Sequence, residues 1–325
     1  MTVTINDIRT AARRLAPVVR RTPLLNDEFV DQALGARLFV KAECLQRYGA
    51  FKIRGAYNKI ASLTPEARAP GVLAFSSGNH AVATAAAARM FGVPAVIVMP
   101  SDAPAAKRAQ AEALGGEVVP YDRATEDREA ICAAIAQARG LALVKPFDDA
   151  DVIAGQGTVG LEIVEDLAVQ GLKPDLVLAC ASGGGLAAGV AVAVKDAAPD
   201  ALAFPVEPEG HDDLARSLAA GERLGNAPGI RSIADALLVD KPGVIPLAVA
   251  SSLWARGLVV SDEEILDAMA QAFLRFRIIV EPGGAVALAA VLSGKIDVRG
   301  KVVAVVASGG NVDPAMFARA LARLA

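Results

Sequence analysis

The feature that most constrains the fold is a regular alternation of short apolar runs with helix-length segments. The runs that favour strands are residues 72–75, 95–99, 117–121 and 143–145. The segments between them that favour helices are residues 81–90, 105–114 and 128–139. This order is typical of βαβ units, in which each helix crosses over to the next parallel strand. The sequence therefore predicts an α/β fold with open parallel sheets.

The alternation resumes beyond residue 148, which indicates a second and larger unit. Its expected elements are helices at 157–169 and 186–196, strands at 176–181, 203–206 and 301–307, and a helix that opens at the Ser261–Glu264 capping box. We expect a small domain, residues 48–145, inserted into a large cofactor-binding domain made of residues 1–47 and 146–325. The chain ends soon after its last predicted helix, so we expect no C-terminal regulatory domain.

Composition excludes several classes of function. The net charge of −3 disfavours a nucleic-acid partner, which needs clustered positive charge. Residues 176–194 carry no charge, but Ser182–Gly185 interrupt them, so a buried strand, turn and helix are favoured over a membrane span. The three cysteines have no paired spacing, and no signal segment opens the chain. A cytoplasmic location is expected.

Three turns of small residues each follow a predicted strand. They are Ser76-Ser77-Gly78, Ser182-Gly183-Gly184-Gly185 and Ser308-Gly309-Gly310. Ligands of parallel sheets bind outside the carboxyl ends of the strands. Three such turns predict one site that is assembled from distant parts of the chain.

The second of these turns is suited to an anion. Its glycine amides precede a helix, and the positive end of a helix binds phosphate. No Lys-Ser or Lys-Thr follows the glycines, which disfavours a nucleoside triphosphate. Gly183, Gly185 and Ala188 also satisfy a relaxed G-x-G-x-x-A pattern, with Asp200 near the place of a ribose-binding acid. A nicotinamide-dependent oxidoreductase therefore remains an alternative.

Longer motifs carry a resemblance to a known family. They are Ala50-Phe51-Lys52-Ile53-Arg54-Gly55-Ala56, Ser76-Ser77-Gly78-Asn79-His80, Ile153–Thr158, Ser182–Leu186, Glu281-Pro282-Gly283-Gly284-Ala285 and Ser308–Asp313. In this order and spacing, from about Thr22 to the C-terminus, they resemble the threonine/serine dehydratase and serine racemase family. That family belongs to the pyridoxal-phosphate enzymes of the tryptophan-synthase β-like fold (fold type II).

The resemblance implies a role for each motif. Lys52 would form the Schiff base with pyridoxal 5'-phosphate and then act as the base at Cα. The substrate carboxylate would be received by Ser76, Ser77, Gly78, Asn79 and His80. The other cofactor-binding residues would be Phe51 beside the ring, Asn79 at the phenolic oxygen, Glu281 near the ring, Ser308 at the pyridine nitrogen, and Ser182, Gly183, Gly184, Gly185 and Leu186 at the phosphate.

This arrangement favours elimination over transamination. A neutral hydroxyl at Ser308 does not favour protonation of the pyridine nitrogen, so the ring is a weaker electron sink and a carbanion expels a β-leaving group. We expect an L-threonine or L-serine dehydratase that acts on a small β-hydroxy amino acid and releases a 2-oxo acid and ammonia. The resemblance also implies a homodimer.

Three alternatives stay open beside the oxidoreductase. Ser77 matches the second acid/base of serine racemases, so racemisation is one of them. Ala50 matches the Ala-Phe-Lys form of some β-hydroxyaspartate dehydratases, although the sequence reveals no cation for a second substrate carboxylate. Ser182 and Ala236 also depart from the family's usual glycines, which leaves the choice of substrate open. The third alternative is a protein that binds an amino acid or phosphate without catalysis.

A metal site is expected at residues 207–213. This segment resembles the divalent-cation loop of the racemase branch, in which the carboxylates of Glu207 and Asp213 and the carbonyl of His211 would be ligands. Water would complete an oxygen shell suited to Mg²⁺, Mn²⁺ or Ca²⁺. The structural alternative is a strand end followed by a helix that Asp212 or Asp213 caps.

Overall fold

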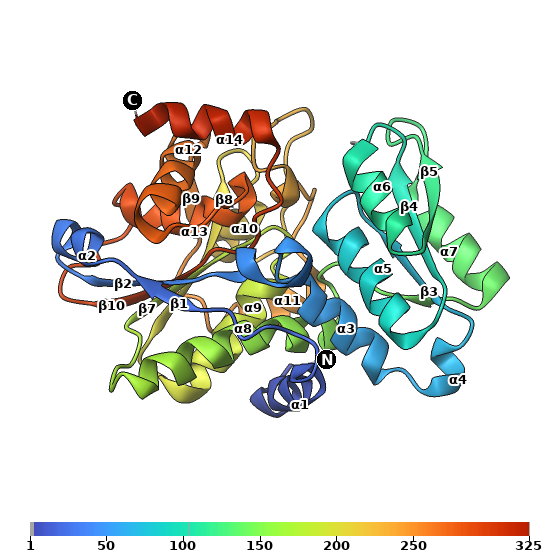
Figure 1. The fold of residues 1–325 in the computed structure, drawn as a ribbon, viewed down its shortest axis with the longest axis horizontal. Coiled ribbons are helices and arrows are strands. Elements are labelled where there is room, and N and C mark those ends of the chain that lie inside the picture. The colour runs from blue at the N-terminus through green and yellow to red at the C-terminus, as the bar shows by residue number, and fades with distance from the viewer. Residues whose placement is uncertain (1–2, 104, 325) are drawn as a thin grey trace.

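The computed structural model describes residues 3–103 and 105–324 and contains two open sheets (Figure 1). The larger sheet has the order β1-β2-β10-β7-β8-β9, and all its strands are parallel except β1. The smaller sheet has the order β5-β4-β3-β6 and is fully parallel. The predicted α/β fold with parallel sheets is confirmed. The strands are β1 Leu24–Asn26, β2 Arg37–Lys41, β3 Val72–Phe75, β4 Ala95–Pro100, β5 Gly116–Tyr121, β6 Ala142–Leu143, β7 Leu176–Cys180, β8 Leu202–Pro208, β9 Leu258–Val260 and β10 Val302–Val306.

Helices cover both faces of the larger sheet. Figure 1 shows α8, α9 and α1 on one side and α12, α13 and α14 on the other. The helices are α1 Ile5–Leu15, α2 Glu28–Leu34, α3 Lys52–Ser62, α4 Pro65–Arg68, α5 Asn79–Phe91, α6 Ala105–Ala113, α7 Arg128–Arg139, α8 Ala150–Val169, α9 Gly185–Ala197, α10 Asp213–Ala220, α11 Val244–Ala250, α12 Asp262–Gln271, α13 Pro282–Leu292 and α14 Pro314–Leu321. Burial on both faces explains the nearly continuous apolar sequence of β7.

Helix α8 begins seven residues earlier than the sequence suggested. The side chain of Asp149 accepts hydrogen bonds from the amides of Asp151 and Val152 and so caps the helix. The glycines inside it mark a close helix contact rather than a loop. A Cβ atom at Gly157 would lie 2.9 Å from the carbonyl oxygen of Gly189, which belongs to α9. Small residues therefore bring α8 and α9 together beneath the sheet.

Other element boundaries lie close to those expected. Strand β6 ends at Leu143, so the prediction that Lys145 belongs to this strand is wrong. The capping box of Ser261 and Glu264 is confirmed, and α12 continues as a π-helical turn to Phe276. The four strands of the small sheet all fall within residues 72–143. The domain boundaries at residues 48 and 145 stay a prediction.

A buried cluster of charged side chains anchors α3. The guanidinium of Arg54 forms ion pairs with Glu43 at 2.8 Å and with Glu162 at 2.7 Å. Lys41 contacts Glu162 at 2.7 Å from the opposite side. Arg54, Glu43 and Lys41 are completely enclosed, so each charge depends on its partners. The cluster holds the start of α3 against β2 and α8.

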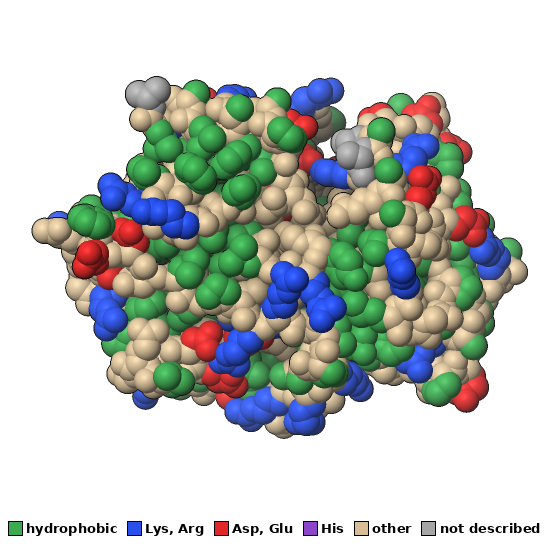
Figure 2. Space-filling model, in the orientation of Figure 1, with side chains coloured by type: hydrophobic (Ala, Val, Ile, Leu, Met, Phe, Trp, Pro, Cys, Tyr) green, Lys and Arg blue, Asp and Glu red, His purple; other side chains and the backbone are tan. Residues whose placement is uncertain are grey.

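Large apolar side chains remain exposed between α12 and α13. They are Phe273, Leu274 and Ile279, and Figure 2 shows apolar side chains gathered over this part of the molecule. Surfaces of this kind often contact another protein chain. The homodimer stays a prediction. No helix in the described part of the chain is both long and apolar enough to cross a membrane.

Candidate active site

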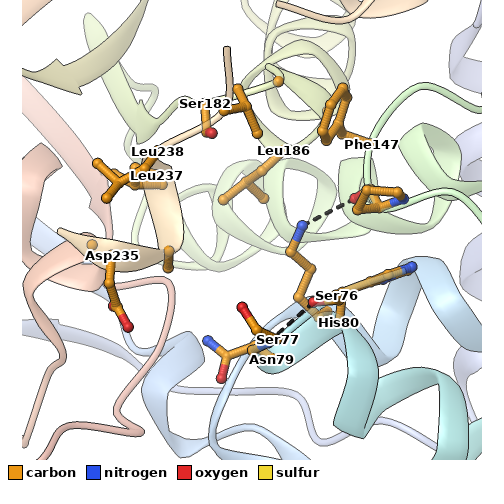
Figure 3. A pocket seen from close by; sticks show the side chains of 18 of the residues that line it. Ser76, Ser77, Asn79, His80, Phe147, Ser182, Leu186, Asp235, Leu237 and Leu238 are labelled. Carbon is orange, nitrogen blue, oxygen red and sulfur yellow. Dashed lines mark hydrogen bonds between the residues drawn. The ribbon is translucent and has the colours of Figure 1, made fainter. Parts of the chain in front are cut away.

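A cavity of about 350 Å³ lies between the two sheets (Figure 3). Its walls include the ends of β3 and β7 and the N-termini of α3, α5 and α9. The volume is typical of pockets for small ligands. Every residue predicted to hold the cofactor or the substrate lines this cavity: Phe51, Lys52, Ser76, Ser77, Gly78, Asn79, His80, Ser182, Gly183, Gly184, Gly185, Leu186, Glu281 and Ser308.

Lys52 is the first residue of α3, and its amine points into the cavity. The preceding segment is held in place by two contacts. Ala50 forms an isolated antiparallel β-bridge with Gly309, and the amide of Phe51 donates to the carbonyl of Ser308 at 3.1 Å. The Lys52 amine donates a hydrogen bond to the carbonyl oxygen of Pro146 at 3.0 Å (Figure 3). No carboxylate of a described residue forms an ion pair with it. A primary amine without a salt bridge in a closed site is suited to nucleophilic attack on a carbonyl group.

Burial lowers the pKa of Lys52 from 10.5 to about 8, although Cys180 and Glu281 oppose the change. The neutral, nucleophilic amine therefore appears as the pH rises through about 8. We expect acetic anhydride to label Lys52 with a midpoint near pH 8 in the cofactor-free protein, as measured by mass spectrometry. In the unfolded chain, the Lys52 amine keeps its proton up to about pH 10.5. The contribution of Lys52 to the free energy of unfolding should therefore increase as the pH rises from about 8 to about 10.5. A labelling midpoint above pH 10 would contradict the lowered pKa.

The glycine loop before α9 forms an anion cradle. Within the described chain, the amides of Ser182, Gly183, Gly184, Gly185 and Leu186 have no hydrogen-bond acceptor. The hydroxyl oxygen of Ser182 is buried and has no partner among the described residues either. Gly184 has a φ of 88°, a conformation that a side chain would strain. These unpaired donors at a helix N-terminus fit a phosphate group.

A second helix N-terminus faces the same cavity. Strand β3 ends at Phe75, and the turn that follows leads into α5. The amides of Ser77, Asn79 and His80 have no acceptor among the described residues. The amide of Gly78 donates to the Ser76 hydroxyl at 3.1 Å, which holds the turn in shape. This second cradle is suited to a carboxylate.

His80 is the second residue of α5, and its imidazole ring is not available as a cation. The Nε2 atom is 2.8 Å from the carbonyl oxygen of Val144, and the side chain is 2% exposed. Burial, together with the nearby Lys52, lowers the pKa of His80 to about 3. The imidazole is therefore neutral at ordinary pH. Any contact of His80 with an anionic substrate has to come from its backbone amide.

Other polar groups of the cavity wall form two hydrogen-bonded pairs. The thiol of Cys180 donates to the Ser308 hydroxyl at 3.2 Å. The Asn79 amide donates to Glu281 at 2.6 Å. Burial raises the pKa of Glu281 to about 7, while the hydrogen bond from Asn79 lowers it. Ser308 thus contributes a neutral hydroxyl to the cavity wall.

Several residues that line the cavity were not predicted from the sequence. Phe147 lies against the glycine loop, where a Cβ atom at Gly183 would overlap its ring. Lys107, Arg123 and Arg128 line the side formed by the smaller sheet and its helices. Lys107 forms an ion pair of 2.8 Å with Asp235, which lies on the opposite wall. None of these residues stands in a recognisable motif, and only the fold brings them to the site.

The predicted metal ligands lie outside this cavity, where β8 ends and α10 begins. The Glu207 carboxylate accepts from the amides of Leu214 and Ala215, and Asp213 accepts from Asn226 at 2.6 Å. The second oxygen of Asp213 is buried and has no partner among the described residues. Burial raises the pKa of Asp213 to about 6, and burial and repulsion from Asp213 raise that of Glu207.

This arrangement fits a cation, because neither of these two neighbouring buried carboxylates forms an ion pair with a described residue. Side chains alone form no three-ligand metal cluster in the described part of the chain. The predicted set has two carboxylates and the His211 carbonyl, with the His211 ring directed instead to the Ile230 carbonyl at 3.1 Å. Asp212 occupies the N-cap position of α10 without a side-chain capping bond. The metal site stays a prediction.

Divalent cations should stabilise the folded protein if this site binds them. At a concentration of about 100 Kd, the expected gain in the free energy of unfolding is about 2.7 kcal/mol. The measurement is the thermal unfolding midpoint in EDTA, Mg²⁺, Mn²⁺ and Ca²⁺. Asp213→Asn should remove the increase, whereas Asp212→Asn should retain it. Equal stabilisation of both variants would place the cation elsewhere.

A buried amine that forms no ion pair with a described residue lies between two amide cradles. This arrangement defines the class of the protein: an enzyme that holds a carbonyl cofactor carrying a phosphate, on an α/β fold with two open sheets. The chain belongs to the family described as pyridoxal-phosphate dependent enzymes, whose model matches residues 15–309. It is 41% identical to the L-threonine ammonia-lyase of Thermotoga maritima, over 98% of this chain and 78% of that protein. It is 39% identical to the L-threo-3-hydroxyaspartate ammonia-lyase of Saccharomyces cerevisiae, over 97% and 95% of the two chains.

Solved structures give the same result for the fold. Maize serine racemase superimposes with a TM-score of 0.92 at 38% identity, covering 100% of this chain and 98% of that one. The resemblance to threonine/serine dehydratases and serine racemases is confirmed, and so are fold type II and the cofactor pyridoxal 5'-phosphate. The chain is a pyridoxal-phosphate-dependent lyase. The unpaired donors of the glycine loop and the Lys52 amine fit this cofactor.

Proposed function

We propose that the protein removes water from a small β-hydroxy amino acid, L-threonine or L-serine, and releases a 2-oxo acid and ammonia. One observation carries this proposal. The Lys52 amine lies in a cavity that also contains one amide cradle suited to a phosphate and another suited to a carboxylate. A relative at 41% identity bears the name L-threonine ammonia-lyase. The site thus has one place suited to the cofactor phosphate and another suited to the substrate carboxylate.

The residues of the chain divide the work between them. The amides of Ser182–Leu186 would hold the cofactor phosphate, and those at the start of α5 would hold the substrate carboxylate. The bound cofactor supplies an electron sink that makes the Cα proton of the substrate acidic. Lys52, whose pKa of about 8 lies near working pH, accepts that proton as its neutral amine.

The β-hydroxyl would leave with the proton that Lys52 took from Cα, so that water is lost and the Lys52 amine becomes neutral again. The Ser308 hydroxyl accepts a hydrogen bond from the Cys180 thiol at 3.2 Å and would be the neutral partner of the cofactor's ring nitrogen. A neutral hydroxyl there would not favour protonation of that nitrogen, so the cofactor would be a weaker electron sink, which favours prompt loss of the β-substituent. The released enamine takes up water and yields the 2-oxo acid and ammonia.

The test is a panel of β-hydroxy amino acids with two readouts. Ammonia and 2-oxo acid report elimination, and chiral chromatography of the remaining amino acid reports racemisation. We expect L-threonine or L-serine to yield equimolar ammonia and oxo acid. Ser77→Ala should reduce the opposite enantiomer more than the oxo acid, because Ser77 would deliver the proton from the other face. Bound cofactor with no ammonia from any member of the panel would refute the proposed function.

A second candidate substrate is 3-hydroxyaspartate, and a specific observation favours it. Arg128 lines the cavity with its guanidinium 5.2 Å from the centre of the Phe75 ring. No carboxylate of the described residues pairs with it, whereas nearby Arg123 pairs with Asp102. Phe75 directly precedes the carboxylate cradle of Ser76–His80. Arg128 is therefore the cation for a second substrate carboxylate that the sequence did not reveal.

Arg128→Met should change substrate preference. Loss of one hydrogen bond to a charged group corresponds to roughly a 10- to 100-fold lower kcat/KM for L-threo-3-hydroxyaspartate. L-threonine should change by less than about threefold, since its methyl group makes no ionic contact. Arg139→Met is the control, because Arg139 lies on the same helix and pairs with Glu117 at the surface. Equal losses for both substrates would exclude this role of Arg128.

A further inference from the structure

Asn311 joins three parts of the site that are distant in the sequence. Its side-chain nitrogen donates to the carbonyl oxygen of Tyr48 and to the side-chain oxygen of Asn79, each at 2.8 Å. Asn79 in turn donates from its own nitrogen to Glu281 at 2.6 Å. Asn79 and Glu281 line the cavity, whereas Asn311 lies behind them. The three side chains form one continuous chain of hydrogen bonds.

The Tyr48 carbonyl determines which groups donate and which accept in this series of hydrogen bonds. A backbone carbonyl can only accept hydrogen bonds, so the end of the Asn311 amide that faces it has to be the nitrogen. Tyr48 has a φ of 62°, a conformation that is unusual for a residue with a side chain. The amide of Gly310 donates to the carbonyl of the next residue, Gly49, at 2.8 Å, which holds this segment in place. The acceptor is thus built into the backbone just before Lys52.

The orientation of the Asn311 side-chain amide determines that of the Asn79 amide. Because the same Asn311 nitrogen faces Asn79, the Asn79 side chain has to present its oxygen there. Its nitrogen then points away from Asn311, where one hydrogen is donated to Glu281. The second hydrogen of that nitrogen has no acceptor among the described residues and is available at the cavity wall. The opposite orientation would place the Asn79 nitrogen against the Asn311 nitrogen, so that two donors would face each other.

We propose that Asn311 is a positioning residue that fixes the Asn79 side chain with its N–H group directed at the cofactor's phenolic oxygen. This inference rests on the proposed function and on the contact with that oxygen that the family resemblance implies for Asn79. A donor held there stabilises negative charge on the phenolic oxygen and so the long-wavelength absorption of the bound cofactor. A free Asn79 amide would sample both orientations and supply that donor only part of the time.

Two substitutions separate orientation from packing. Asn311→Asp has nearly the same shape but carries only acceptors, so it attracts the Asn79 nitrogen and turns the Asn79 oxygen toward the cofactor. Asn311→Leu removes the polar contacts and leaves Asn79 free to adopt either orientation. Cofactor affinity and the intensity of the long-wavelength absorption band should therefore both decrease from wild type to Asn311→Leu and further to Asn311→Asp. Asn58→Asp is the control, because Asn58 is also buried and donates to a backbone carbonyl, that of Asp151.

Cofactor affinity can be followed through the single tryptophan of the chain. Trp254 is buried and donates to the Ala187 carbonyl at 3.4 Å, beside the phosphate cradle. Pyridoxal phosphate should quench its fluorescence on binding. For Asn311→Asp we expect Kd to rise about 10- to 100-fold, the effect of losing one hydrogen bond to a charged group. The pH at which the absorption band of the bound cofactor changes should also rise.

The outcomes distinguish this inference from the function on which it rests. If wild-type protein neither binds pyridoxal phosphate nor retains it after borohydride reduction, the proposed function fails. If the wild type binds the cofactor and Asn311→Asp matches it in Kd and in absorption, Asn311 has no positioning role. An effect of Asn311→Leu equal to or larger than that of Asn311→Asp would indicate packing and would also overturn the inference. Circular dichroism of each variant identifies those that do not fold.

Discussion

Lys52→Ala protein should bind pyridoxal phosphate but lose covalent attachment and nearly all ammonia release. The amine has two functions in the proposed reaction, because it holds the cofactor through a covalent bond and accepts the Cα proton. Loss of a positioned proton acceptor alone costs roughly 10²- to 10⁴-fold in rate. Ammonia release is measured with L-threonine and L-serine, and borohydride reduction followed by mass spectrometry locates the attached cofactor.

Lys59→Ala is the matched control for this experiment. Lys59 lies on the same helix, α3, but its amine pairs with Asp149 at 2.8 Å, away from the cavity. We expect this variant to keep its covalent cofactor and an activity within about threefold of wild type. Ammonia release by Lys52→Ala at the wild-type rate, or reductive attachment at another lysine, would exclude the proposed role of Lys52.

Arg54→Met should produce the largest loss of stability, about 3–5 kcal/mol in the free energy of unfolding. The substitution leaves Glu43 and Glu162 facing each other without the guanidinium that contacts them at 2.8 and 2.7 Å. Glu43 is fully enclosed, and the pairing with Arg54 keeps its pKa low despite burial. Urea unfolding of the cofactor-free protein measures the change.

Arg9→Met provides the comparison for Arg54. Arg9 pairs with Asp196 at 2.9 Å on the surface, where an ion pair contributes about 0–1 kcal/mol. We also expect Arg54→Met to weaken cofactor attachment, because Arg54 lies two residues after Lys52 and secures the start of α3. If both arginine variants unfolded at the same urea concentration, the buried cluster would not be the anchor of this helix.

The sequence contained enough information to locate the reacting groups. Lys52, the turn at Ser76 and the glycine loop at Ser182 each stand in a contiguous motif, and their order indicated one shared site. The sequence pattern placed the start of α8 too late, because glycines that mark a close helix contact were not recognised as part of the helix. Arg128 had no such signal. An arginine near the start of an amphipathic helix looks the same in sequence whether it faces solvent or a cavity.

The hydrogen bonds through Asn311 also show that a local sequence pattern does not reveal contacts between distant residues. Asn311 and Asn79 are separated by 232 positions, and Asn79 and Glu281 by 202. Their contacts depend on how the start of α5 meets the loop after β10. Nothing in the local sequence around Asn79 specifies which end of its amide faces the cavity.

The sequence by itself determined the α/β class, the lysine and the two turns that supply backbone donors. Local patterns suffice for these features, because strand period, helix caps and glycine conformations act over a few neighbouring residues. The tertiary structure decided the enclosure that lowers the Lys52 pKa, the unpaired Arg128 on the cavity wall and the orientation of Asn79. Burial, charge balance and amide direction depend on groups brought together by folding, and a linear pattern carries no measure of that proximity.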